Sequence, residues 1–179
     1  MNNFGFPELR EVKTAYPHGF HRCDRFGRPV YIERIGPVDI DRILAVTTED
    51  RLVRYYIREY ERTIEDRLPA CSRVFGRDIR QYTSIFDLKG VSMGMMTKKL
   101  IDFVKRTGKI TGEFYPEMVS KTYVVNAPFI FNAIWKTIKG FLPKATVDNV
   151  QISRDAKILE EVIDPEDLPE FLGGHCKCK

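Results

Sequence analysis

Two short segments carry residue types and spacings that occur at metal and phosphate sites. Residues 175–178 read His-Cys-Lys-Cys, and imidazole and thiolate groups are ligands that zinc prefers. A structural zinc site needs four ligands, and the sequence offers no second ligand pair nearby, so we expect no metal site. Residues 90–94 have glycines at both ends, as in a phosphate loop, but Met95 and Met96 stand where such a loop needs glycine and lysine. We interpret this segment as a strand-to-helix turn.

Catalytic arrangements are also missing from the sequence. There is no Gly-x-Ser-x-Gly elbow, no Walker loop and no dinucleotide-binding glycine fingerprint. Of the three histidines, His18 and His21 flank Phe20, and no nucleophile pairs with either of them by spacing. Cys23 and Cys71 are far apart in the sequence, which predicts buried or unreactive thiols. We therefore expect a protein that is not an enzyme and that needs no cofactor.

The bulk properties predict one globular domain. The 179 residues are 43% hydrophobic and 30% charged, with a formal net charge of +4. The basic residues are interleaved with acids, which argues against a nucleic-acid partner. No apolar run is long enough for a membrane span, and residues 1–16 lack the apolar core of a signal peptide. We expect a soluble, cytoplasmic protein.

Hydrophobic periodicity predicts strands that alternate with helices. The predicted strands are residues 30–35, 82–88, 123–125 and 147–152, and the predicted helices are residues 39–45, about 49–68, 100–107, 112–120, 129–141 and 156–163. Pro69 is expected to close the long second helix, and Gly108 to end the third. This alternation is typical of an α/β fold with a mostly parallel sheet and crossover helices.

The helix predicted after Pro128 differs from an ordinary core helix because its apolar stripe is unusually wide. Its only charged residues are Lys136 and Lys139. Two interpretations remain: a helix packed on the sheet, or a movable lid that is apolar toward a lipid and able to touch a bilayer. In the second interpretation the two lysines contact anionic headgroups. We call this lid the gate. The apolar residues assigned to the gate and to the lining around a lipid's acyl chains are Phe129, Ile130, Phe131, Ile134, Trp135, Ile138 and Phe141.

Six motifs occur in an order and spacing that resemble a known family. They are residues 24–31 (Asp-Arg-Phe-Gly-Arg-Pro-Val-Tyr), 67–73 (Arg-Leu-Pro-Ala-Cys-Ser-Arg), 87–90 (Asp-Leu-Lys-Gly), 114–117 (Phe-Tyr-Pro-Glu), 126–129 (Asn-Ala-Pro-Phe) and 168–174 (Leu-Pro-Glu-Phe-Leu-Gly-Gly). Together they resemble the CRAL-TRIO domain of yeast-type phosphatidylinositol/phosphatidylcholine transfer proteins. The resemblance implies a CRAL-TRIO domain over residues 16–174, between an extension (1–15) in place of the family's N-terminal helical domain and a tail (175–179). It also implies a sheet floor beneath an apolar cavity for one phospholipid, closed by the gate.

The resemblance further implies residues for two headgroups. For phosphatidylinositol, Glu117 and Thr146 match the family's glutamate and threonine, while Asn149 replaces its lysine and its arginine has no counterpart. Losing two cations weakens binding of a phosphate-bearing headgroup.

For phosphatidylcholine, the family uses two tyrosines, a serine and a threonine. Tyr60 matches one tyrosine, Phe20 replaces the other, Tyr82 stands at the serine position and Ser84 replaces the threonine. Rings near a quaternary ammonium act through cation–π contact, so choline is favoured. Each of these polar residues also has a purely structural interpretation, as a core side chain or a partner of the backbone.

The resemblance predicts a carrier that binds one phospholipid and touches membranes transiently. Two alternatives remain open. One is a carrier of a smaller hydrophobic molecule such as a sterol or tocopherol, and the other is a lipid-sensing regulatory or scaffold module.

Overall fold

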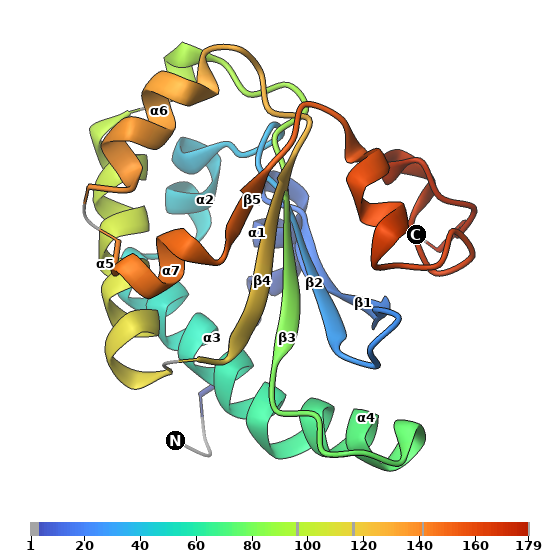
Figure 1. Ribbon diagram of the computed structural model, residues 1–179. Helices are drawn as coiled ribbons and strands as arrows, with labels where there is room; N and C mark the ends of the chain where they lie inside the picture. The colour runs from blue at the N-terminus through green and yellow to red at the C-terminus, as the bar shows by residue number, and fades with distance from the viewer. Residues whose placement is uncertain (1–3, 96, 116, 141, 179) are drawn as a thin grey trace.

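The computed structural model describes residues 4–178 except 96, 116 and 141, and Figure 1 shows a central sheet between two unequal layers. The strands are β1 (His18–Cys23), β2 (Pro29–Arg34), β3 (Tyr82–Asp87), β4 (Val119–Val125) and β5 (Val150–Ile152). The helices are α1 (Leu9–Ala15), α2 (Ile40–Val46), α3 (Glu49–Arg62), α4 (Leu68–Phe75), α5 (Lys98–Phe114), α6 (Phe131–Ile138) and α7 (Lys144–Asp148). Short 3-10 turns cover Met93–Met95, Ala156–Glu161 and Glu170–Leu172.

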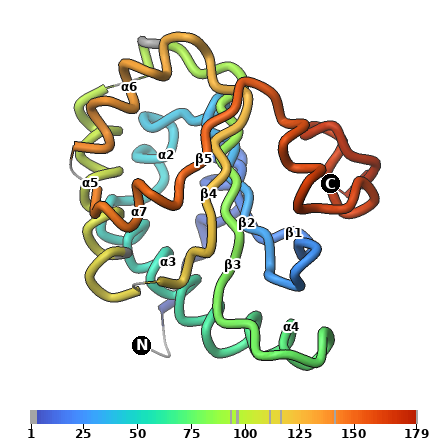
Figure 2. The backbone as a smooth tube through the Cα atoms, viewed as in Figure 1, coloured from blue at the N-terminus to red at the C-terminus, as the bar shows by residue number. Residues whose placement is uncertain are grey.

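The sheet order is β1-β2-β3-β4-β5, and only the β1–β2 pair is antiparallel. The mostly parallel α/β fold predicted from the sequence is therefore confirmed. Figures 1 and 2 show α2, α3, α5, α6 and α7 on one side of the sheet and the C-terminal segment on the other.

The face of the sheet toward the C-terminal segment is filled by an apolar core. Val30, Ile85 and Val125 project from three neighbouring strands and pack against Leu159 and Leu168, and all five are at most 1% exposed. The opposite face bears the helices and an apolar cavity. Since one face is sealed by aliphatic packing, a ligand has room only on the helical face.

The long helix does not end at Pro69, contrary to the sequence prediction. Residues Thr63–Arg67 form a π-helical turn, in which the Leu68 N–H donates to the Thr63 carbonyl, and α4 begins directly after it. Proline is tolerated in the first turn of a helix because its missing N–H has no intrahelical acceptor there. The chain therefore stays helical through the wider π turn, and α4 begins one residue before the proline.

Helix α5 likewise continues where the sequence predicted a break at Gly108 and a separate helix over 112–120. A β-carbon at Gly108 would lie 3.2 Å from Leu142, and one at Gly112 would lie 3.1 Å from Pro143. Both glycines therefore serve close packing of α5 against the segment after α6, and they do not end the helix.

Three further elements, α1, β1 and α7, are not predicted from the sequence. Helix α1 lies within residues 1–15, and its Val12 is completely buried. Strand β1 contains Gly19 and an irregular polar pattern, which hides its strand character. The predicted strand over 147–152 is shorter, because α7 occupies its first residues.

Candidate functional site

The helical face of the sheet encloses an apolar cavity of about 300 Å³. Strands β2 to β5 form its floor, and α2, α3, α5, α6 and α7 form its walls. The residues that line it are Tyr16, Glu33, Ile35, Val38, Ile40, Ile43, Leu52, Tyr56, Tyr60, Phe86, Leu88, Val91, Leu100, Ile101, Phe103, Val104, Thr107, Gly108, Thr122, Val124, Phe131, Ile134, Trp135, Ile138, Leu142, Thr146 and Val150. Within this set, Glu33 is the only acidic or basic side chain.

The Glu33 carboxyl has a raised pKa in this apolar setting. Its carboxyl accepts a hydrogen bond from the Tyr16 hydroxyl. Burial raises the Glu33 pKa from 4.5 to about 7, against the opposing effect of that hydrogen bond. The pKa of Tyr16 is also raised well above its usual value, chiefly by burial. At neutral pH the cavity wall therefore carries hydrogen-bonding groups and one carboxyl that is only partly ionised.

A cluster of aromatic rings lies at one end of the cavity. The rings of Phe20 and Tyr31 are 5.0 Å apart, Phe20 and Tyr82 are 5.7 Å apart, and Tyr31 and Tyr82 are 6.3 Å apart. These three residues share a small pocket with Tyr56 and Tyr60, and the latter two also line the main cavity. We call Phe20, Tyr31, Tyr60 and Tyr82 the aromatic cluster.

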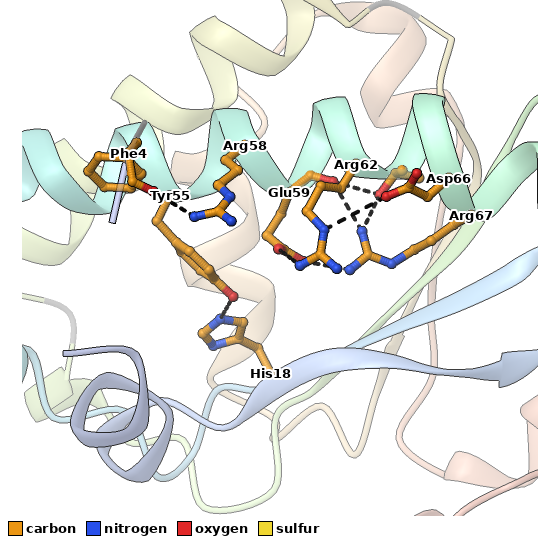
Figure 3. Close-up of polar contacts among 9 residues, drawn as sticks. Phe4, His18, Tyr55, Arg58, Glu59, Arg62, Asp66 and Arg67 are labelled. Atoms are coloured by element: carbon orange, nitrogen blue, oxygen red, sulfur yellow. Dashed lines mark hydrogen bonds and ion pairs between the residues drawn. The ribbon is translucent and has the colours of Figure 1, made fainter. Parts of the chain in front are cut away.

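The polar face of α3 closes this end of the cavity toward β1. We call α3, the π turn and α4 together the helical segment. Figure 3 shows Tyr55, Glu59 and Arg67 pointing from this segment toward the strand that carries His18. Arg67 donates to Glu59 at 2.8 Å, and its guanidinium lies 4.4 Å from the centre of the Phe20 ring. His18 contacts the Tyr55 hydroxyl at 3.0 Å. These contacts fix Phe20, and with it the aromatic cluster, against α3.

The four residues assigned to a choline headgroup are brought together. Phe20, Tyr60 and Tyr82 belong to the aromatic cluster, and Ser84 is buried on the sheet floor, where its register neighbours are Tyr31 and Thr122. Sequence reasoning missed Tyr31. Its alternation with Glu33 along β2 places both on the cavity face, which was the signal available.

The three residues assigned to an inositol headgroup do not share one site. Thr146 lines the cavity, and Asn149 is exposed at the end of α7. Glu117 is exposed with φ +61° in a separate open groove that also contains Arg77 and Arg80.

The predicted gate divides into cavity-facing and outward-facing residues. Phe131, Ile134, Trp135 and Ile138 of α6 line the cavity, and Lys136 and Lys139 are exposed. Ile130 is partly buried beside the core under α6. Phe129, assigned to the same lining, is instead 76% exposed and lies beneath the Arg154 guanidinium at 3.8 Å. Phe141 lies outside the described residues.

Comparison with protein families identifies the family of this chain. The family model for the CRAL/TRIO domain matches residues 13–174. The chain belongs to the CRAL/TRIO domain family. Among curated CRAL/TRIO relatives, it is 43% identical over 180 residues to phosphatidylinositol/phosphatidylcholine transfer protein SFH9 of Arabidopsis thaliana, covering 99% of this chain and 31% of that protein. It is 37% identical to the Sec14 cytosolic factor of Schizosaccharomyces pombe, covering 99% of this chain and 63% of that protein.

The chain thus spans about a third of the plant CRAL/TRIO relative and just under two thirds of the yeast one. The crystal structure of Sfh5 shares its fold, with a TM-score of 0.74 over 99% of this chain and 59% of that one, at 23% identity. In the described part of this CRAL/TRIO domain, no helix combines the length and apolarity needed to cross a bilayer. Nor does that part hold a group of three or more side chains arranged to bind a metal ion.

Proposed function

We propose that this domain binds one phospholipid in the apolar cavity and carries it between membranes, with phosphatidylcholine as the favoured ligand. The main support for this proposal is the cavity itself. Its described lining contains Glu33 as the single acidic or basic residue. Burying acyl chains there stabilises the complex by roughly 25 cal/mol per Å² of apolar surface. The name of the Arabidopsis relative, a phosphatidylinositol/phosphatidylcholine transfer protein, supports the same ligand class.

The aromatic cluster supports a choline headgroup. A quaternary ammonium interacts favourably with ring faces, and a buried cation also needs compensating negative charge. Glu33, with a pKa of about 7, can supply that charge on the cavity wall, because a nearby cation favours the ionised carboxylate. The residues assigned to an inositol headgroup form no comparable site at the cavity, because Glu117 lies in the separate groove.

Loading requires a movable wall. The cavity of about 300 Å³ is smaller than a phospholipid with two acyl chains. Helix α6 is a wall suited to move, because its N-cap residue, Ile130, makes no side-chain capping bond and its outer side carries the exposed Lys136. We propose that α6 swings outward as the gate while its exposed lysines contact the bilayer. We propose that the working protein is cytoplasmic and binds the surface of membranes transiently.

A carrier of a smaller hydrophobic molecule is the second candidate. The observation that favours it is again the cavity volume, which is at the lower end of the range for small-molecule sites. A sterol or tocopherol needs less widening than a phospholipid, so competition against a fluorescent phosphatidylcholine separates the two candidates.

The first test is to extract the purified protein with organic solvent and identify the bound lipid by mass spectrometry. We expect one phospholipid per chain and, after incubation with mixed vesicles, enrichment of phosphatidylcholine. Thr122→Trp fills the cavity from its floor and should lower the occupancy at least tenfold, since Thr122 is a buried lining residue. Val74→Trp is the matched control, because Val74 is 80% exposed on α4. A folded protein that takes up no lipid from vesicles would contradict the proposal.

Charge reversal on α6 separates membrane contact from lipid binding. Lys136→Glu/Lys139→Glu should slow transfer to anionic vesicles roughly tenfold or more, because each lysine near such a surface contributes about 1 kcal/mol. Lipid occupancy should be unchanged, since both side chains are exposed. Lys157→Glu/Lys177→Glu makes the same charge change beyond the other face of the sheet and should transfer normally. If both double variants slowed lipid transfer equally, the lysines of α6 would have no specific role in membrane contact.

A further inference from the structure

Cys23 and Cys71 are 48 positions apart in the sequence, yet their sulfur atoms lie 3.6 Å apart. Both residues are half-buried free thiols, Cys23 at the end of β1 and Cys71 in the first turn of α4. A disulfide bond is about 2.05 Å long, so the two sulfurs need to approach by only about 1.6 Å. Side-chain rotation can supply such a movement.

An irregularity in β1 brings Cys23 to this position. The register of β1 against β2 shifts between Phe20 and Cys23, and Arg22 within the shift has φ +52°. Side chains of a regular strand alternate, so Phe20 and Cys23 would point to opposite faces. The extra residue of a bulge reverses that alternation. Phe20 and Cys23 therefore point to the same face of the sheet, Phe20 toward the other rings of the aromatic cluster and Cys23 toward α4.

The π-helical turn places the other thiol. It sets α4 directly after Arg67, which pairs with Glu59 and lies over the ring of Phe20. Cys71 follows Arg67 by four positions, about one helical turn. The thiol pair is thus the next contact between β1 and the helical segment beyond the Arg67–Phe20 stacking, at the edge of the aromatic cluster.

We propose that Cys23 and Cys71 form a reversible disulfide when exposed to a peroxide, and that this bond clamps β1 to α4 beside the headgroup end of the cavity. The first part stands on the sulfur geometry alone, and the effect on lipid exchange rests on the proposed function. The separation of the two thiols in the sequence predicts buried or unreactive cysteines and does not reveal that they meet in the fold.

The reaction is a two-electron oxidation of the pair. One thiolate attacks hydrogen peroxide to give a sulfenic acid and releases hydroxide, which takes up a proton to become water. The second thiol then displaces the sulfenic oxygen as a second water, and the sulfur–sulfur bond forms. Overall, two thiols and one peroxide give one disulfide and two waters. Burial raises the pKa of the Cys23 thiol, which disfavours Cys23 as the attacking thiolate.

The clamp restricts the end of the cavity that the aromatic cluster occupies. β1 is the edge strand of the sheet and carries Phe20. Any movement of β1 away from the helical segment breaks the stacking of Arg67 on Phe20 and opens the cluster. A covalent bond one turn beyond opposes that movement. Oxidation should therefore slow both uptake and release of the headgroup.

Mass spectrometry tests the bond directly. The protein carries four cysteines, and Cys176→Ser/Cys178→Ser leaves only the pair in question. After peroxide treatment and alkylation, trypsin should yield residues 23–25 linked to residues 68–73, and dithiothreitol should separate them. The melting temperature of the oxidised protein should rise by about 5–10 °C, because the bond restricts the unfolded chain. Two fully alkylated thiols after treatment, or only dimers linked between chains, would overturn the proposal.

Transfer assays test the clamp. Oxidation should slow phosphatidylcholine exchange between vesicles at least threefold in this background, and dithiothreitol should restore it. Cys71→Ser in the same background is the control and should exchange at one rate in both conditions. A linked peptide with unchanged exchange would refute the clamp alone. A protein that exchanges no lipid even when reduced would count against the proposed function, while the peptide and melting results would still decide the disulfide.

Discussion

Asp24→Ala is expected to lower the free energy of unfolding by about 3–5 kcal/mol. The Asp24 side chain is fully buried and accepts four hydrogen bonds. Two come from the backbone N–H groups of Phe26 and Arg28, which form the turn between β1 and β2. The others come from the Arg28 side chain and from the Thr83 hydroxyl on β3. Removing the carboxylate leaves these donors without their acceptor.

The effect should reach the cavity because this network sets the position of β1. Thr83 is 1% exposed in the middle of the sheet, and its bond to Asp24 measures 2.7 Å. It therefore ties the β1–β2 turn to β3. Since β1 carries Phe20, a loosened turn should also weaken lipid binding, and added lipid should raise the melting temperature less than it does in the wild type.

Denaturant unfolding followed by circular dichroism measures the change, and Asp164→Ala is the matched control. Asp164 pairs with Arg25 at 2.7 Å, but both side chains are about half exposed. Exposed pairs contribute less than about 1 kcal/mol. If Asp24→Ala costs no more than Asp164→Ala, then the buried carboxylate does not organise the turn.

The apolar lining of the site is visible in the sequence because hydrophobic periodicity reports which face of an element is buried. The stripe of Phe131, Ile134 and Ile138 faces the cavity as its helical spacing implies. The same reasoning fails for Phe129, which precedes α6 and is held outside by Arg154. Periodicity predicts a face only for residues within the helix, and the helix begins two residues later than Phe129.

Other features depend on tertiary contacts that no local pattern records. The sequence predicts a helix end at Gly108, but the missing side chain instead allows Leu142 to pack closely there. Strand β1 lacks an alternating pattern, since it is an edge strand with a bulge. The pairing of Cys23 with Cys71 arises from that bulge and from the π turn together. Both are departures from regular geometry, and regular geometry is what sequence patterns encode.

Glu33 and His18 are expected to give the folded protein two opposite pH dependences that cancel. Burial raises the Glu33 pKa from 4.5 to about 7, so the folded state keeps a proton that the unfolded state loses. Stability due to Glu33 therefore falls as the pH rises from 4.5 to 7. Burial lowers the His18 pKa from 6.5 to about 4, so the unfolded state binds the extra proton. Stability due to His18 rises over pH 4 to 6.5. Each effect amounts to about 3 kcal/mol.

Burial keeps His18 neutral, and hydrogen bonding selects its tautomer. Its Nδ1 lies 2.7 Å from the Tyr16 carbonyl, which can only accept, so Nδ1 carries the proton. Its Nε2 then accepts from the Tyr55 hydroxyl at 3.0 Å. If Nε2 were protonated, the Tyr55 hydroxyl could rotate to accept from it, so the cost of charging His18 comes from burial. Glutamine can keep both contacts without titrating, which makes His18→Gln the appropriate variant.

The cancellation is tested by measuring the unfolding free energy from pH 4 to pH 8 for each variant relative to the wild type. Glu33→Gln should gain about 3 kcal/mol relative to the wild type between pH 4.5 and pH 7, because it removes the cost of ionising a buried carboxyl. His18→Gln should gain a similar amount as the pH falls from 6.5 to 4. A Glu33→Gln curve parallel to that of the wild type would mean that Glu33 ionises at its ordinary pKa. The cavity would then hold a full negative charge at neutral pH, and a cationic headgroup would be needed to compensate it.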